Sequence, residues 1–288
     1  MDSVLTRRGA DVLEMARMEL SSSVADAARR SALRCAVFIA SPLLWQVSSV
    51  GLASEPVPPQ QRVDQILTRL QERSDGLSDI RCKVEFVEDD RINLSKRRKL
   101  GQILFLITEP NPNFMIRFDR TESDGVLGRR EWYLFDGHWL YQAVERTRQV
   151  TKQEIVRPPD RINLFDLEKT PFPLPFGQKK KKILKNFDVT LVSPSPSDPP
   201  NTDHLVCVPK PDSSMYGKYD KLEFFILRDI HLPCRVVVTK GGGYEIIRAD
   251  FPDLTAKSLN TGVKRKEFTR PKAWQGYEET VEELPPAP

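Results

Sequence analysis

Apolar residues recur at two spacings along the chain, and the change from one to the other separates a helix from a run of strands. The first spacing, i, i+3, i+4 and i+7, predicts an amphipathic helix over residues 62–77 that Asp75-Gly76 ends. From Ile80 the period becomes two, which is typical of half-buried strands. The apolar positions of the helix are Val63, Ile66, Leu67 and Leu70.

The alternating pattern predicts roughly nine or ten strands, many of them antiparallel neighbours, in a single domain of mainly β (α+β) class. In the clearest hairpin, segments 132–135 and 138–141 flank Asp136-Gly137, a dipeptide that suits a two-residue type I′ turn. Residues 89–99 are too charged to belong to the core. Further strands are expected at 80–88, 103–108, 114–118, 148–151, 187–191, 205–208, 222–227, 234–239 and 244–247.

Prolines between residues 158 and 177 exclude a regular strand there, although 161–169 could form two turns of helix. The apolar side chains of this Pro-rich segment must be buried, and we expect them to form a plug or lid packed on the sheet. Next, Lys179–Lys182 are expected to form a solvated loop tip, the alternative being contact with anionic lipid headgroups or an acidic protein face. The candidate lid residues are Leu164, Phe165, Phe172 and Phe176.

The N-terminal residues follow the order of an export signal. Basic residues up to Arg34 precede the apolar run 35–45 and the small residues of 50–53. We expect 29–54 to be a signal peptide directing the chain to the periplasm or cell envelope, with an uncleaved inner-membrane anchor as the alternative. The predicted layout is an N-terminal extension at 1–28, the signal at 29–54, a linker at 55–60, a domain at 61–280 and a disordered tail at 281–288. Because a basic region normally follows the start methionine closely, the extension indicates that translation begins at a later start codon.

Charge and cysteine usage narrow the classes of partner. The chain has 44 Lys and Arg against 40 Asp and Glu, a net charge of +4, so nothing demands a nucleic acid. After removal of Cys35 with the signal, Cys82, Cys207 and Cys234 remain, each at an apolar strand position. They are either buried thiols or one disulfide with a thiol left over. No Cys/His cluster predicts a metal site.

Catalytic patterns are missing from the sequence. His138, His204 and His231 each lie in or beside a predicted turn, which favours a surface or capping role. The sequence has no GxSxG or HExxH motif, and Gly241–Gly243 joins two strands and cannot hold a phosphate at a helix N-terminus. We therefore expect no enzymatic activity and no cofactor.

Several strands are apolar on both faces, which is unusual for a sheet wet on one side. A packed core under a second sheet or a helix explains this surplus, and so does a curved sheet that holds an apolar ligand. The candidate ligand-binding residues are Phe105, Ile107, Phe114, Ile116, Phe118, Trp132, Leu134, Trp139, Tyr141, Phe224, Ile226 and Val236.

The order of these parts resembles the LolA/LolB superfamily of periplasmic outer-membrane lipoprotein carriers. The similar parts are the signal, the helix, the turn and strand at 109–118, the hairpin at 132–141 and the paired strands within 222–238. The resemblance implies an incomplete antiparallel β-barrel (half-barrel) with an N-terminal helix and a short helical or Pro-rich lid, around an apolar cavity for acyl chains. The Pro-rich segment at 158–177 and the polar tract at 193–203 depart from the superfamily pattern.

The expected function is that of an exported, monomeric carrier of lipid or lipoprotein acyl chains, served by a membrane-associated donor or acceptor protein. Burial supplies the affinity, since each methylene removed from water contributes about 0.8 kcal/mol. The alternative is a periplasmic regulatory module that senses lipid or protein on the same half-barrel.

Overall fold

The strands of the chain form one open sheet. The computed structural model describes residues 58–157, 160–161, 176–177 and 179–285. The predicted signal, all but the first residue of the helix expected at 161–169, and lid residues Leu164, Phe165 and Phe172 lie outside these ranges. The strands, with their bounds, are β1 (Asp79–Asp90), β2 (Ser95–Leu106), β3 (Asn113–Ser123), β4 (Val126–Gly128), β5 (Glu131–Phe135), β6 (Trp139–Val144), β7 (Gln149–Glu154), β8 (Phe187–Val192), β9 (Thr202–Pro209), β10 (Lys221–Leu227), β11 (Pro233–Lys240), β12 (Glu245–Asp250) and β13 (Glu278–Glu282).

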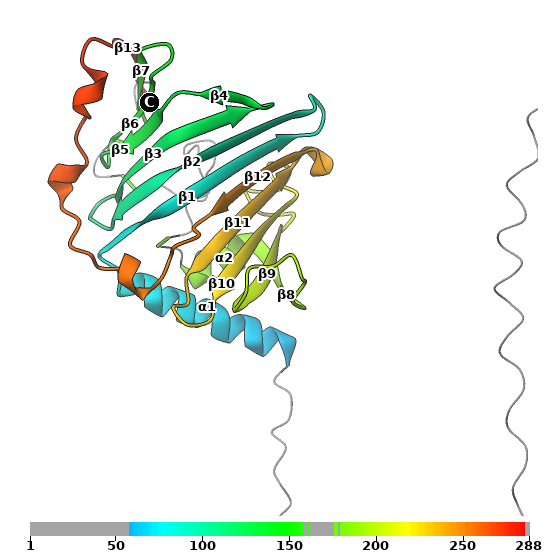
Figure 1. The fold of residues 1–288 in the computed structure, drawn as a ribbon. Coiled ribbons are helices and arrows are strands. Elements are labelled where there is room, and N and C mark those ends of the chain that lie inside the picture. Colours follow the sequence, from blue (N-terminus) through cyan, green and yellow to red (C-terminus); the bar gives the residue numbers. More distant parts are fainter. Residues whose placement is uncertain (1–57, 158–159, 162–175, 178, 286–288) are drawn as a thin grey trace, which may run out of the picture. The chain divides into compact units, whose positions relative to one another are not determined.

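The sheet runs in the order β13-β7-β6-β5-β3-β2-β1-β12-β11-β10-β9-β8, with β4 paired to β3 outside this path. All neighbours are antiparallel except β13 and β7, which run parallel. Because β13 and β8 do not pair, the strongly curved sheet stays open, as Figure 1 shows. The half-barrel expected from the sequence is confirmed.

Helix α1 (Pro59–Asp75) follows the predicted amphipathic pattern. Pro59 occupies the first helical position, where a missing N–H costs nothing, and Gly76 follows the last turn as predicted. Val63, Leu67 and Leu70 are buried against the sheet. The helix begins inside the predicted linker and lies across one end of the strands (Figure 1).

The charged stretch 89–99 forms the end of a long hairpin between β1 and β2. Both faces are largely exposed there, and ion pairs such as Arg98–Glu85 at 2.8 Å link the two strands. Lys99 is the exception to the expectation that this stretch lies outside the core, because its side chain is buried.

The hairpin of β5 and β6 is confirmed, but its turn is displaced by one residue from the prediction. Phe135 pairs with Leu140, and the N–H of Asp136 donates to the carbonyl of Trp139 at 3.2 Å, so Gly137 and His138 are the central residues. Gly137 alone has a positive φ, 97°, which fits a type II′ turn better than the predicted type I′. A carboxylate oxygen of Asp136 accepts the N–H groups of residues 138 and 139.

Apolar side chains cover both faces of the sheet, but different elements cover each face. We call the face that packs against α1 the inner face and the opposite one, packed against residues 263–277, the outer face. The inner cluster draws on β1–β3, β5, β6 and β8–β12, whereas the outer cluster is confined to the β2–β3–β5–β6–β7 side. Residues 263–277, which we call the C-terminal cover, include the short 3₁₀ turns η3 (Arg265–Glu267) and η4 (Lys272–Trp274). An earlier turn, η2 (Ala256–Ser258), lies near β1.

The lysine cluster at 179–182 does not form the predicted solvated loop tip. It opens a second helix, α2 (Lys180–Asn186), which buries Ile183 in the inner cluster. The ammonium of Lys180 donates a hydrogen bond to the hydroxyl of Thr68 on α1 at 2.9 Å and forms an ion pair with Asp64. The charge of Lys180 is therefore used in the contact between the two helices. None of the described helices is long and apolar enough to cross a membrane.

The chain end runs beside β7 at the edge of the sheet. Strand β13 continues to Glu282, and the backbone groups of Leu284 and Pro285 hydrogen-bond to side chains near the end of β7. Glu278, Glu279 and Glu282 are exposed along this short edge strand.

Candidate functional site

The inner face of the half-barrel presents a continuous apolar surface. Alternate residues of β2, β3, β10 and β11 point to it, because side chains along a strand alternate between the two faces. Aromatic rings from neighbouring strands touch across it, with centroids 5.6 Å apart for Phe114–Phe135 and 6.2 Å for Phe86–Phe118. This surface is the best candidate binding site for an apolar ligand.

Phe176, near the end of the Pro-rich segment, plugs the middle of this surface. Its side chain is 0% exposed and its ring lies 5.7 Å from that of Phe105 and 5.1 Å from that of Phe251. Neither a strand nor a helix carries Phe176. A turn residue therefore packs on the centre of the inner face, between Phe105 and Phe251.

The inner face also holds one buried cation, near the hairpin end of β2. Lys99 is only 4% exposed, and its Nζ lies 2.8 Å from a carboxylate oxygen of Glu131 and 3.4 Å from the hydroxyl of Tyr133. The ammonium also lies over the rings of Phe118 and Tyr133, 5.6 Å from each centroid. Burial, with the nearby charge of Glu131, raises the pKa of Tyr133, so this phenol stays neutral.

Glycine is required next to this cation. The register between β2 and β3 shifts between Leu100 and Gly101, a bulge that bends the sheet. A Cβ at residue 101 would overlap the carbonyl oxygen of Arg117 on β3. The strands approach so closely that a side chain at residue 101 cannot fit, and Lys99 points inward two residues before it.

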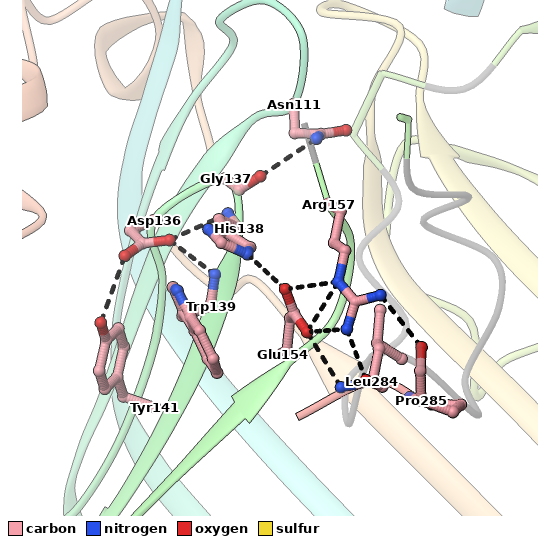
Figure 2. A network of polar contacts seen from close by, with 10 residues as sticks. All are labelled: Asn111, Asp136, Gly137, His138, Trp139, Tyr141, Glu154, Arg157, Leu284 and Pro285. Atoms are coloured by element: carbon pink, nitrogen blue, oxygen red, sulfur yellow. Dashed lines mark hydrogen bonds and ion pairs between the residues drawn. The ribbon is translucent and has the colours of Figure 1, made fainter. Parts of the chain in front are cut away.

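A polar network fixes the chain where it leaves β7 toward the Pro-rich segment, as Figure 2 shows. The guanidinium of Arg157 donates to both carboxylate oxygens of Glu154, at 2.8–3.1 Å, and Nε2 of His138 lies 2.8 Å from the same carboxylate. Mainly through Arg157 and then His138, these contacts hold the pKa of Glu154 at about 2. Arg157 also donates to the carbonyls of Leu284 and Pro285, which ties the chain end to this point.

Two further contacts extend this anchor. The side-chain amide of Asn111 donates to the carbonyls of Gly137 and Asp160, at 3.1 and 2.9 Å. On the far side of the Pro-rich segment, Lys179 pairs with Asp75 at the end of α1. The two described stems of that segment are therefore held by charged contacts outside the apolar surface.

The candidate ligand-binding residues divide between the two faces. Eight of them, Phe105, Ile107, Phe114, Ile116, Phe118, Phe224, Ile226 and Val236, belong to the inner cluster or pack against it. The other four, Trp132, Leu134, Trp139 and Tyr141, belong to the outer cluster or pack against it. The structure therefore does not bring all twelve to one surface.

Trp132 and Leu134 were assigned to the same surface because β5 is apolar at every position from 132 to 135, so alternation along this strand cannot show which side chains point to which face. The pairing of Phe114 with Phe135 settles the face, and it turns Tyr133 and Phe135 inward. The sequence analysis also missed Lys99 and Phe251. The alternation of Lys99 with Ile103 and Phe105 was the available signal for the first of these two.

None of the three cysteines in the described part of the chain is a reactive thiol. Burial raises the pKa of Cys207 to about 12 and that of Cys234 to about 11, and it also raises the pKa of Cys82. All three are free and no disulfide links them; Cys82 and Cys207 are buried, as the thiol interpretation expects, whereas Cys234 is half-buried. They pack as small apolar residues at neutral pH.

The histidines follow the turn prediction in part. His138 and His231 lie in turns, but His204 lies in β9, stacked on Phe225 with centroids 4.1 Å apart. Its ring also lies 3.2 Å from Glu223 and 3.5 Å from Asp198. Within the described ranges, no group of three or more His, Cys, Asp and Glu side chains could hold a metal ion.

The sequence matches no protein-family model and no curated protein. Among solved structures, the chain is similar to an uncharacterized conserved protein from Thermus thermophilus, with 14% identity over 77% of this chain and 100% of that chain and a TM-score of 0.42. It is also similar to MucB from the MucA/MucB complex of Pseudomonas aeruginosa, with 13% identity, 74% and 62% coverage and a TM-score of 0.40. A LolA superfamily protein from Nitrosomonas europaea matches with 14% identity, 72% and 97% coverage and a TM-score of 0.33.

Proposed function

We propose that this chain is a non-enzymatic carrier that binds acyl chains of lipids or lipoproteins on its inner face, in the cell envelope. The observation that carries the proposal is the plug: a continuous apolar surface is covered at its centre by Phe176, which comes from a turn. The signal pattern at 29–54 supports export.

An acyl chain can replace this plug at little net cost. Exposing a buried phenylalanine side chain costs about 1.5–3 kcal/mol, and each methylene that leaves water contributes about 0.8 kcal/mol. Two to four methylenes of an acyl chain would therefore offset the displacement of Phe176, about the length that one ring occupies. Longer chains would then bind with a net gain, and their release would need a membrane or a partner protein that accepts the chain.

Photolabelling tests the proposal. A fatty acid with a diazirine in its chain is added to the purified protein, irradiated, and the labelled residues are mapped by mass spectrometry. We expect saturable labelling, displaced by unlabelled oleate, in α1 and in the segment around Phe251. These elements contact only the inner face.

The outer face provides the internal control for this experiment. Residues 263–277 contact the outer cluster and not the inner one, so labelling that concentrates there would contradict the proposed site. Labelling that oleate does not displace would contradict specific binding. A protein that binds no acyl chain but captures an envelope protein at a saturable site would favour the regulatory alternative.

A further inference from the structure

A groove runs along the N-terminal half of α1, between this helix and the sheet strands β8, β9 and β10. It consists of two adjoining hollows of about 410 and 230 Å³, which share Arg62, Asp203 and Arg228 as lining residues. The larger one lies within the size range of ligand sites, about 300–1,000 Å³. The groove is therefore large enough for the polar part of a small ligand.

Arginine dominates the charge of this groove. Arg62 and Arg69 lie seven residues apart on α1, so both project from the same side of the helix. Both are exposed, and neither forms an ion pair with a residue in the described ranges. Arg228, on the opposite wall, donates from Nε to Asp203 at 2.9 Å, so three guanidinium groups face one carboxylate.

The bottom of the groove is continuous with the inner face. Ile226 lines the smaller hollow and belongs to the inner cluster, and Ile66 lines it from the α1 side and packs against the same cluster. Leu191 lines the larger hollow and also packs against the inner cluster. A ligand with a charged end and an apolar chain could thus occupy both regions without crossing the sheet.

We propose that this groove binds the anionic headgroup, a phosphate or a carboxylate, of the lipid whose acyl chain occupies the inner face. This inference rests on the proposed function and adds the class of lipid. Guanidinium groups bind phosphate and carboxylate through paired N–H donors, and Arg62 and Arg69 have their donors available. Asp203 keeps Arg228 in place and limits the excess positive charge to the α1 side.

His204 contributes less to this site than the arginines do. His204 borders the larger hollow, but its ring is already engaged by Glu223 and Asp198, and Glu223 in turn pairs with Lys221 at 2.8 Å. The binding of an anion therefore depends mainly on the arginines, and it should weaken as salt is added because Arg62 and Arg69 are exposed.

The test compares lipids that share an oleoyl chain, measured by calorimetry with the purified protein. Lysophosphatidic acid and oleate carry the two anionic groups, monoolein is neutral, and inorganic phosphate is a headgroup without a chain. We expect the anionic lipids to bind about tenfold or more tightly than monoolein, which corresponds to about 1.4 kcal/mol. Phosphate alone should not compete at comparable concentrations; effective competition would identify a site for the free anion and overturn the lipid assignment.

A double substitution, Arg62→Glu with Arg69→Glu, should remove the preference, so that the anionic lipids bind this variant no more tightly than monoolein does. The matched control is Arg129→Glu with Arg146→Glu, which makes the same change of net charge at exposed positions in the connections β4–β5 and β6–β7. Equal losses in both double variants, or equal binding of anionic and neutral lipids by the unmodified protein, would overturn the headgroup site. If monoolein and the anionic lipids all fail to bind, the carrier function fails as well.

Discussion

Replacing the plug, Phe176→Ala, tests whether the inner face is a binding surface or only a core. The side chain is fully buried between Phe105 and Phe251, and removal of a buried phenylalanine side chain costs about 3–5 kcal/mol of unfolding free energy. For a domain of this size, each kcal/mol lowers the melting temperature by about 2–4 °C, so the apo variant should melt about 6–20 °C lower. Calorimetry or circular dichroism measures this shift.

The same substitution should increase the affinity for an acyl chain, because the ligand no longer has to displace a ring. The saving of about 1.5–3 kcal/mol predicts oleate binding roughly ten- to a hundredfold tighter than in the unmodified protein. Saturating ligand should then recover part of the lost stability, about 2.7 kcal/mol at a hundredfold excess over Kd. A core without a binding function would lose stability and gain no affinity.

The control variant is Phe268→Ala, which removes an equally large, buried side chain from the outer cluster. It should lose a comparable amount of stability and bind oleate as the unmodified protein does. The reasoning is refuted if Phe176→Ala binds oleate no more tightly than the unmodified protein, or if Phe268→Ala gains affinity by the same factor.

Three other substitutions test the parts that support the site. Gly101→Ala should lower the unfolding free energy by about 1–3 kcal/mol or more in urea titrations, because its Cβ overlaps the β3 backbone; unchanged stability would contradict the close approach. Lys99→Met should lower the unfolding free energy by up to about 3–5 kcal/mol because it leaves the carboxylate of Glu131 without its cation. Adding Glu131→Leu should restore most of the lost stability. The depressed pKa of Glu154 stabilises the fold above the unfolded value near 4.5, and this contribution disappears as pH falls toward 2. Glu154→Gln should therefore flatten acid unfolding between about pH 4.5 and 2, and an unchanged acid transition would show that the network contributes nothing.

The elements with strong apolar periodicity were predictable from the sequence. Helix α1 and the central strands followed the spacings of 3.6 and 2, because one side of each element is buried. Strands β4 and β13 were missed because nearly all their side chains are exposed, so no alternation marks them. Helix α2 was missed because four lysines predict solvent exposure, whereas three acceptors on α1 engage the first two of them: Asp64, Thr68 and Asp75.

Locating the inner-face residues requires knowing to which face of the sheet each side chain points. On β3, Arg117 and Asp119 mark the wet side and leave Phe114, Ile116 and Phe118 to the inner face. On β5 no polar residue between 132 and 135 breaks the pattern, and only the register with β3 distinguishes Trp132 from Tyr133. The headgroup groove could not be found in the sequence, since its walls come from segments more than a hundred residues apart.

The distribution of tryptophan between the two faces has an optical consequence. Trp132, Trp139 and Trp274 all lie in or against the outer cluster, and the aromatic residues of the inner cluster are phenylalanines and tyrosines. Indole emission from this part of the chain will therefore report detachment of the C-terminal cover, while the thickness of the sheet screens it from an acyl chain on the other side. A titration that leaves the tryptophan spectrum unchanged is the result expected of a ligand that binds on the inner face.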